Sequence, residues 1–434
     1  MKRLTLVLPL AAAFAATVHA GPVADGPMAF SPIAGSAYGR ENDADVATAP
    51  WIVPAGYVQT LVADERDLDL YVANDRVDMI ATNESGTDAG RYLYRTHEVR
   101  GARAARTDGG SGAAVSVVDL KTGRVSELVG RADWEALDGI LWTPWRTLLF
   151  AEEVADSALP DPDVPQAKSG LVYELRLDPR DPMTAGRVSV RPLLGALAHE
   201  GIETDAEGNV YVIDEQHQGS LYKFVPDRYG DLSSGRLYAL RVRNGARTGA
   251  ADWVPLDMKQ VRISARVAAA AVGATPYCRP EDLERIENTL YVALTCEDVD
   301  DPANTRGAGA VMAVELGGPP VVSYVVAAGR NAPVENAARG ITGFKHPDNL
   351  ANGPDGKLWI VEDNPYSDIW VYDPRSEDAN GDGYRDGVHL FASLKDKAGE
   401  GSGIFFGKDP RTLYVNVQHS GTGNDKTMAI TRQR

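Results

Sequence analysis

The stretch EGIETDAEGNVYVIDE, residues 200–215, determines how this chain folds. Its two runs with alternating apolar residues flank a turn centred on Gly208, which is the pattern of a β-hairpin. Glu200 opens the first run, and Asp214 and Glu215 close the second. The stretch therefore predicts two antiparallel strands whose acidic side chains gather at one end of the pair.

The same sequence motif recurs along the chain, and its repetition predicts the fold class. Three clear copies and two weaker ones are DGILWTPWRTLLFAEE from Asp138, EDLERIENTLYVALTCED from Glu281, PDNLANGPDGKLWIVED from Pro347, SGIFFGKDPRTLYVNVQH from Ser402 and LDLYVANDRVDMIATNE ending at Glu84. Six copies at intervals of tens of residues predict repeated antiparallel sheets in a radial arrangement, which is an all-β fold, a β-propeller of about six blades. The 43 glycines and 26 prolines also favour many turns over long helices.

The first residues predict export of the protein. Lys2 and Arg3 precede an apolar run over residues 4–17, and small residues surround Ala20. This pattern is typical of a secretory signal peptide cleaved near Ala20, so we expect the mature protein in the periplasm or outside the cell. The expected division of the chain is a signal peptide over 1–20, an N-terminal arm over 21–51 and a propeller domain over 52–434.

Two segments depart from the repeated motif. Residues 258–272, MKQVRISARVAAAAV, form the best helical window and predict a small helical insertion on one face. Residues 155–170 are rich in Asp, Pro and Ala and predict a long loop.

The composition limits the partners. A net charge of −17 argues against binding to nucleic acid, since many Lys and Arg side chains would be needed to neutralise phosphates. No apolar run outside the leader approaches the length of a membrane span. We therefore expect a monomer that acts on a small molecule, without nucleic acid or membrane span.

The chain holds two cysteines, Cys278 and Cys296. They stand at the start and the end of two adjacent strands of one repeat, hence at the same edge of the predicted sheet. In an oxidising compartment this placement predicts a disulfide between them.

The acidic strand ends predict a metal site. In a propeller the innermost strand of each blade lines a central channel and the next strand returns beside it, so the ends carrying the acids meet at one mouth. The expected neighbours are Asp138 with Glu152 and Glu153, Glu200 with Asp214 and Glu215, Glu281 with Glu297, and Asp348 and Asn349 with Glu362 and Asp363. Crowded carboxylates repel each other unless a cation intervenes, and a set of oxygen ligands favours Ca2+. The alternative is a solvated rim of polar turn residues without a metal.

A second calcium site is predicted in a loop. Asp378, Asn380, Asp382 and Asp386 place oxygens at positions 1, 3, 5 and 9 of a segment with glycine at position 6. Position 12 is His389, so this is not an EF-hand, and we expect a structural calcium loop between strands. The alternative is an ordinary Asn-Gly-Asp-Gly turn.

One basic residue is predicted to point into the same mouth. Arg279 stands just ahead of Glu281. A guanidinium in this place suits a tetrahedral oxyanion, although an ion pair with neighbouring carboxylates is an equal alternative. The chain has no GxSxG elbow and no P-loop, which argues against serine hydrolases and P-loop nucleotide enzymes.

These segments resemble one family. TPWRTLLFAEE at 143–153, LGALAHEG at 194–201, RPEDLE at 279–284, PDNLANGPDGKLWIVED at 347–363 and RTLYVNVQHSG at 411–421 are similar to segments of the PhoX-type alkaline phosphatases, and ATNESG at 81–86 is a partial match to their NHEY motif. The family comprises periplasmic propeller phosphatases that combine calcium ions with an iron pair. The resemblance implies a phosphate contact for Arg279 and metal-ligand roles for Glu84, Glu152, Glu153, Glu200, Glu281, Asp348 and Asn349.

The chain departs from the family at one metal ligand. The position of the iron-binding cysteine, five residues before the Thr of TPW, is occupied by Asp138. A carboxylate is a harder ligand than a thiolate. We therefore expect Asp138 to be a metal ligand, and we expect its replacement of the cysteine to weaken Fe3+ binding while still permitting Ca2+ binding.

The resemblance favours a secreted hydrolase of phosphoesters, with Arg279 and Glu281 as the catalytic residues and calcium in the channel. Two alternatives stay open at this point. One is a calcium-dependent lactonase-type propeller hydrolase, and the other is a calcium-stabilised binding propeller without catalysis.

Overall fold

The computed structural model describes residues 23, 26–86, 88–154, 161–167 and 170–434. The predicted signal peptide lies outside the described residues, as do residues 155–160 and 168–169 of the predicted loop. No helix in the described part of the chain is long and apolar enough to cross a membrane.

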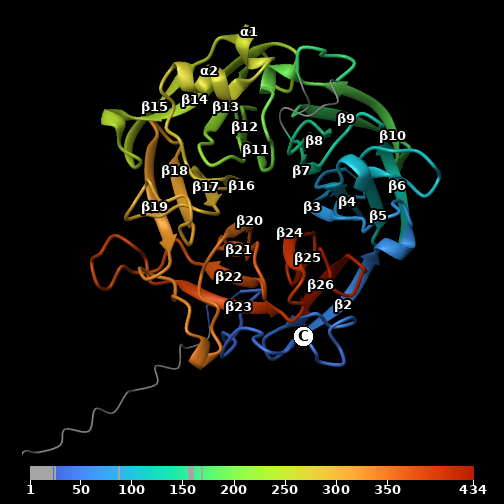
Figure 1. Ribbon diagram of the computed structural model, residues 1–434, viewed down its shortest axis with the longest axis vertical. Helices are drawn as coiled ribbons and strands as arrows, with labels where there is room; N and C mark the ends of the chain where they lie inside the picture. The colour runs from blue at the N-terminus through green and yellow to red at the C-terminus, as the bar shows by residue number, and fades with distance from the viewer. Residues whose placement is uncertain (1–22, 24–25, 87, 155–160, 168–169) are drawn as a thin grey trace, which may run out of the picture.

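The strands form six blades around a central axis, and the predicted β-propeller is confirmed (Figure 1). The first blade holds β3 (Val77–Thr82), β4 (Tyr92–His97), β5 (Ala114–Asp119) and β6 (Arg124–Gly130). The second holds β7 (Leu137–Trp142), β8 (Leu148–Glu152), β9 (Val172–Asp178) and β10 (Asp181–Val190). The third holds β11 (Ile202–Thr204), β12 (Val210–Ile213), β13 (Leu221–Pro226), β14 (Gly235–Val242) and β15 (Gly249–Pro255).

The remaining blades follow the same order from the axis outward. The fourth holds β16 (Pro280–Ile286), β17 (Thr289–Leu294), β18 (Ala310–Glu315) and β19 (Val321–Ala327). The fifth holds β20 (Pro347–Asn352), β21 (Leu358–Glu362), β22 (Asp368–Tyr372) and β23 (Val388–Leu394), with β1 (Trp51–Ile52) at its edge. The sixth holds β24 (Glu400–Phe406), β25 (Thr412–Gln418), β26 (Lys426–Arg432) and β2 (Tyr57–Asp64).

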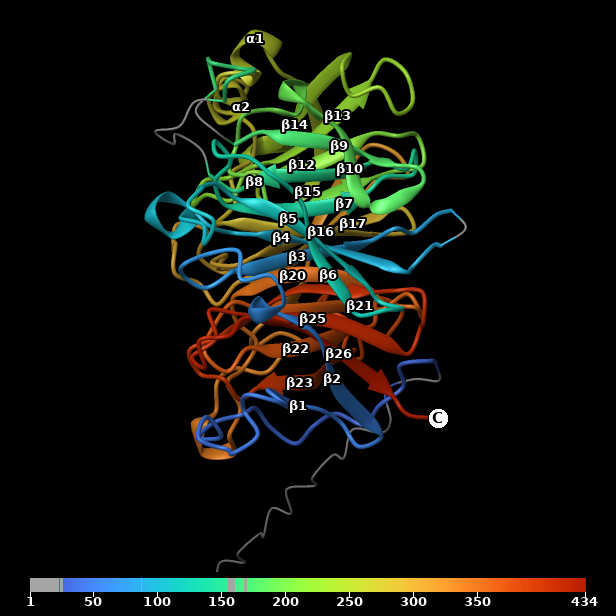
Figure 2. The ribbon, with the colours of Figure 1, turned by 90° about the vertical axis from the view of Figure 1, so that its right-hand side faces the viewer.

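The ring closes by pairing the two ends of the chain. Strand β2 lies antiparallel to β26, with Tyr57 opposite Arg432 and Asp64 opposite Lys426 (Figure 2). The third and fourth blades are also joined, because β15 and β19 pair at two positions. Closing the ring covers strand edges that would otherwise be open to pairing with other chains.

Apolar side chains pack between neighbouring blades. Trp134 contacts Phe150 and Tyr173 at one such interface, and Trp359 contacts Phe391 at another. Phe30, in the segment before β1, packs on the latter pair. This packing holds the inner strands in place around the axis.

The predicted helical insertion is present as two short helices. Helix α1 (Met258–Val261) is capped by Asp257, and α2 (Ala265–Ala271) is capped by Ser264, whose side chain accepts a hydrogen bond from the Val267 N–H. Short 3-10 turns complete the described elements: η1 (Glu65–Asp67), η2 (Gly101–Ala104), η3 (Pro192–Leu194), η4 (Arg243–Gly245) and η5 (Ala337–Arg339).

The inner strands carry irregularities that position the acidic residues. The pairing register shifts between Leu137 and Ile140 in β7, and likewise between Pro347 and Leu350 in β20. A bulge of this kind re-aims the side chain within it, which here is Asp138 or Asp348. Glycine follows Asp138 because a Cβ on Gly139 would lie 1.6 Å from the Glu200 carbonyl oxygen. The neighbouring inner strands therefore approach closely where the acids stand.

Candidate functional site

One carboxylate from each blade lies at the same end of the innermost strand. These six side chains line one cavity of about 230 Å3. They are Asp78 on β3, Asp138 on β7, Glu200 just before β11, Glu281 on β16, Asp348 on β20 and Glu400 on β24. We call this cavity the funnel. The structure thus brings together Asp138, Glu200, Glu281 and Asp348 from the predicted metal ligands.

The ends of the second strands add a further ring of residues. The Glu98 N–H donates to the Arg76 carbonyl at 2.9 Å, and the Glu153 N–H donates to the Ala136 carbonyl at 2.9 Å. The Asp363 N–H donates to the His346 carbonyl in the same way. Each bond fastens the end of a second strand to the residue two positions before an inner carboxylate. As a result Glu98, Glu153 and Asp363 also line the funnel.

The residue before this ring turns away from the funnel. Glu152 accepts hydrogen bonds from the N–H groups of Glu135 and Leu171 and from the Tyr173 hydroxyl. Asp214 is held by Arg266, and Glu362 accepts from the Trp370 indole. In the pairs Glu152–Glu153 and Glu362–Asp363, then, one carboxylate supports the blade and the next lines the funnel, whereas Glu215 accepts a hydrogen bond from Arg279. Glu152 belongs to the first kind, although it was predicted as a metal ligand.

Three of the inner carboxylates are close enough to hold one ion. Oxygens of Glu200, Glu281 and Asp348 lie within 4.8 Å of one another. Asn349 is buried beside them, and its amide donates to Glu200 at 3.2 Å while its oxygen accepts from the Gly403 N–H at 2.5 Å. Asn349 therefore orients Glu200, and its side-chain oxygen is already engaged by the backbone.

Burial makes ionisation of these acids unfavourable. It raises the pKa of Glu281 to about 7, with the charge on Glu215 adding to the effect. Burial and the neighbouring carboxylates hold the pKa values of Glu200, Asp348 and Asp138 well above their ordinary range. Acids in this state must keep their protons or neutralise a cation.

The donor set fits a hard cation. Oδ1 of Asp138 is buried and has no hydrogen-bond partner among the described residues, so it offers an unused oxygen beside the cluster. Most of the side chains that line the funnel and could bind a metal are carboxylates, joined by Gln418 and His419. Calcium accepts six to eight oxygens in irregular arrangements, which matches this chemistry.

Arg279 lies at the edge of the same cluster. Its Nε donates to Glu215 at 2.7 Å, and its terminal nitrogen lies 3.2 Å from Glu281. Its side chain is about one third exposed, so part of the guanidinium faces the cavity. The backbone holds it at a φ of 46°, with the Arg279 N–H donating to Gln216 and the Thr295 N–H donating to the Arg279 carbonyl.

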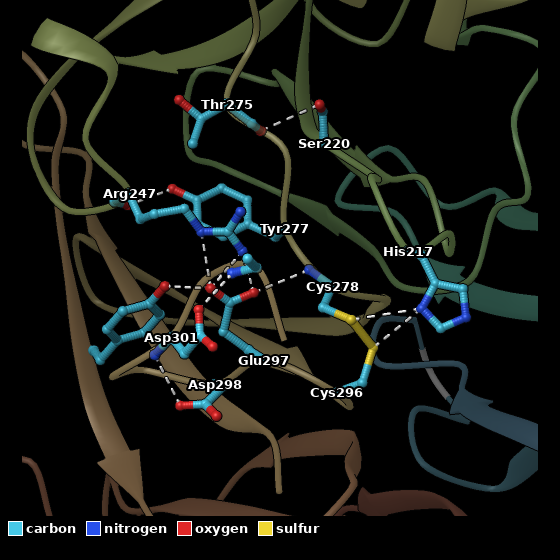
Figure 3. Close-up of polar contacts among 12 residues, drawn as sticks. His217, Ser220, Arg247, Thr275, Tyr277, Cys278, Cys296, Glu297, Asp298 and Asp301 are labelled. Carbon is cyan, nitrogen blue, oxygen red and sulfur yellow. Dashed lines mark hydrogen bonds and ion pairs between the residues drawn. A yellow bond between two sulfur atoms is a disulfide. The ribbon is translucent and has the colours of Figure 1, made fainter. Parts of the chain in front are cut away.

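A disulfide stands directly behind Arg279, as predicted. Cys278 and Cys296 are bonded with Cα atoms 5.2 Å apart (Figure 3). The Cys278 N–H donates to Glu297, which also binds Arg247, and Nδ1 of His217 lies 3.6 Å from each sulfur. Because the sulfurs are joined to each other, this group supports the strand ends and offers no thiolate to a metal. Glu297, expected near Glu281, belongs to this support.

Glu84 lies apart from the funnel. It lines a separate cavity at the other end of the inner strands, together with Trp142, Glu203 and Phe406. The reason is that Val77–Thr82 is the first strand of its blade and not the second, so Glu84 follows the far end of an inner strand. The counterpart that does reach the funnel is Glu98, after β4.

The predicted calcium loop is exposed and lies between β22 and β23. Asp378 accepts hydrogen bonds from the N–H groups of Gly381 and Gly383, and Asp386 accepts from the Ala379 N–H. Asn380 donates to Asp382 at 3.1 Å. The carboxylates thus satisfy amides of the loop itself, and calcium binding by Asp378, Asn380, Asp382 and Asp386 stays a prediction.

Several funnel residues were missed from the sequence. They are Arg76, Asp78, Glu98, Arg100, Glu400, Gln418 and His419. The signal for two of them was present, because Arg76 and Asp78 repeat the spacing of Arg279 and Glu281. Arg76 also has the same backbone conformation as Arg279, with a φ of 46°.

Comparison with solved structures gives a full-length match. PhoX of Pseudomonas fluorescens, in complex with the transition-state analogue vanadate, aligns with a TM-score of 0.63 at 18% identity over 94% of this chain and 98% of that chain. At this identity the match establishes the fold.

Two other solved structures align less well. Virginiamycin B lyase of Staphylococcus aureus has a TM-score of 0.42 at 12% identity, covering 86% of this chain and 99% of that one. Hydrazine synthase of Kuenenia stuttgartiensis has a TM-score of 0.44 at 13% identity, covering 83% and 96%. With such low scores neither match informs the function.

Comparison by sequence is more specific. Among curated proteins no sequence matches this chain. Residues 141–421, more than half of the chain, match the family described as alkaline phosphatase PhoX. The chain belongs to the PhoX family of alkaline phosphatases.

Proposed function

We propose that the funnel is the active site of an exported, calcium-dependent phosphoester hydrolase. The observation that carries this proposal is the buried group of Glu200, Glu281 and Asp348, with oxygens within 4.8 Å, in the same cavity as Arg279. Membership of the PhoX family supports the reaction class. The match to a PhoX structure that holds vanadate supports an oxyanion as the ligand of this fold.

Glu200, Glu281 and Asp348 would hold the metal, with Asp138 supplying a further oxygen. A bound calcium ion would polarise the phosphoryl oxygens and orient the ester. Asp138 stands where the family resemblance places an iron-binding cysteine, and a carboxylate oxygen suits Ca2+ better than a thiolate does. We therefore propose calcium as the ion that matters and expect weak iron binding.

Arg279 would bind the phosphoryl group directly. Its guanidinium faces the cavity while Glu215 and Glu281 fix its orientation. A preorganised donor of this kind stabilises the charge that develops on the equatorial oxygens. Glu281 has two tasks in this arrangement, since it serves as a metal ligand and holds Arg279.

The test compares Arg279→Ala with wild-type protein on phenyl phosphate. We expect kcat/KM to fall by roughly 10²–10³ while calcium per chain, measured by elemental analysis, stays the same. Arg339→Ala is the matched control because Arg339 is exposed and ends η5, away from the funnel.

The same assay separates the other functions. Hydrolysis of lactones without hydrolysis of phosphomonoesters or phosphodiesters, with calcium alone and with added iron, would replace the proposal by a lactonase. No turnover of any ester would leave a calcium-binding propeller without catalysis.

A further inference from the structure

Basic side chains also line the funnel. Arg76, Arg100, Arg279 and His419 line the same cavity as the carboxylates. The Arg100 side chain is 50% exposed and Arg279 is 33% exposed, whereas Glu281 is 3% exposed. Arg100 and Arg279 are therefore more open to solvent than the carboxylate of Glu281.

Two of these bases share one acid. Arg76 lies 3.2 Å from one oxygen of Glu98, and Arg100 lies 3.3 Å from the other. Arg76 is largely covered, and its N–H is also fastened to Asp425, so its position is fixed. Among the described residues Arg100 has this one ion pair. A guanidinium has five N–H donors, so most of those on Arg100 are left for a ligand.

The pair stands across the funnel from Arg279. Arg76 and Arg100 precede and follow the first hairpin of blade one, and Arg279 precedes the inner strand of blade four. In a ring of six blades these two are opposite each other, as β3 and β16 are in Figure 1. An anion that extends from Arg279 across the cavity would meet the guanidinium of Arg100.

A bound cation would strengthen this asymmetry. Carboxylates that neutralise a metal are less available to their arginine partners, so these arginines become more available to an anion when the metal is bound. On the side of blade one, two guanidinium groups share Glu98, and Asp78 is buried in the same blade. The half-exposed guanidinium of Arg100 therefore favours a second negative group on the substrate.

We infer that Arg100, with Arg76 behind it, binds a second anionic group of the substrate. The favoured substrates are phosphoesters whose leaving group carries a carboxylate or another phosphate. This inference rests on the proposed phosphoester hydrolysis and adds the substrate class. Arg100 determines specificity, while Arg76 positions Glu98.

The experiment compares two substrates that differ in one charge. Phenyl phosphate and 4-carboxyphenyl phosphate share the reacting group, and only the second has a distal carboxylate. We expect wild-type protein to favour the carboxylated ester by about tenfold in kcat/KM, the range that a hydrogen bond to a charged group supplies. Arg100→Gln should reduce this ratio to about one. Rising salt should reduce it in the wild type, because Arg100 is half exposed.

Arg103→Gln is the matched control. Arg103 belongs to the same turn, η2, and is exposed outside the cavity, so it makes the same change in net charge without touching the site. Its ratio should equal that of the wild type. A wild-type ratio near one, or equal losses on both substrates in Arg100→Gln, would overturn the inference while leaving the phosphatase proposal standing. Failure of the wild type to hydrolyse either ester would instead overturn both.

Discussion

Replacing Glu281 by glutamine should change stability in opposite directions with and without calcium. The Glu281 side chain is 3% exposed, and its neighbours include the acids Glu200 and Asp348. Burial raises its pKa from 4.5 to about 7, which corresponds to about 3 kcal/mol against the ionised form in the folded protein. Glutamine removes this cost because it carries no charge at any pH.

The sign follows from the direction of the pKa shift. A carboxyl group whose pKa is raised by folding contributes stability at low pH, and that contribution is lost as the pH rises from about 4.5 to about 7. At a pH of about 8 in the absence of metal, Glu281→Gln should therefore be more stable than the wild type. The gain is at most about 3 kcal/mol, or roughly 3–6 °C in Tm, because the ion pair with Arg279 is lost as well.

Calcium should reverse this order. A ligand present at 100 times its dissociation constant stabilises the folded state by about 2.7 kcal/mol. The wild type should show such an increase in Tm, and Glu281→Gln should lose most of it, since a neutral amide is a weaker ligand for Ca2+.

The assay is thermal unfolding at a pH of about 8, in chelator and then in excess calcium. Glu207→Gln is the control, because Glu207 is exposed in the turn between β11 and β12 and its replacement makes the same change in net charge. Lower stability of Glu281→Gln in chelator, together with a normal response to calcium, would refute the reasoning. Glu281 would then act only as the ion-pair partner of Arg279.

Two further predictions concern stability and a third concerns calcium binding. In chelator, the wild-type Tm should fall as the pH rises from about 5 to about 8, because burial raises the pKa of Asp78 to about 7 as well. A Tm that rises over this range would contradict this prediction. Replacing both Cys278 and Cys296 by alanine should lower the free energy of unfolding, measured by urea titration, by about 3 kcal/mol, because the disulfide joins residues with a sequence separation of 18. An unchanged free energy of unfolding would show that the disulfide does not stabilise the fold. Asp378→Asn should weaken calcium binding at one class of sites in a calorimetric titration without affecting hydrolysis. An unchanged titration would exclude the loop as a calcium site.

Much of the fold was predictable because it rests on a repeated local pattern. A hairpin recurs in every blade, with acidic residues at its ends in most of them, and this local pattern distinguishes strands from turns without reference to tertiary contacts. The closure of the ring by β2 and β26 was not predicted, because that pairing joins segments more than 300 residues apart and neither carries a local signal for the other.

The candidate site was predictable where the repeat was regular. Asp138, Glu200, Glu281 and Asp348 stand at equivalent positions of clear copies, and the structure gathers them in the funnel. Two kinds of residue escaped this reasoning.

The first kind comes from the weaker copies. In blade one, the sequence pattern made Val77–Thr82 the second strand of its hairpin, but this strand is the innermost one. For this reason Glu84 was predicted in place of Asp78 and Glu98. In blade six, the motif was begun two residues after Glu400.

The second kind depends on side-chain direction. Glu152 and Glu153 are adjacent, and alternate residues of a strand point to opposite sides. Sequence places both at the strand end, but only the packing of Tyr173 and Leu171 against Glu152 decides which one faces the channel.

If calcium in the funnel supports hydrolysis of phosphoesters, phosphate release should depend on added calcium, and a calcium titration measures this dependence. The protein is freed of metal by chelation, and release of phosphate from 4-carboxyphenyl phosphate and phenyl phosphate is followed as calcium is returned. We expect no turnover without metal and a saturable recovery with calcium alone in the wild type, and no such recovery in Glu281→Gln. Hydrolysis that survives complete removal of calcium, or no hydrolysis at any calcium concentration, would contradict calcium-dependent hydrolysis.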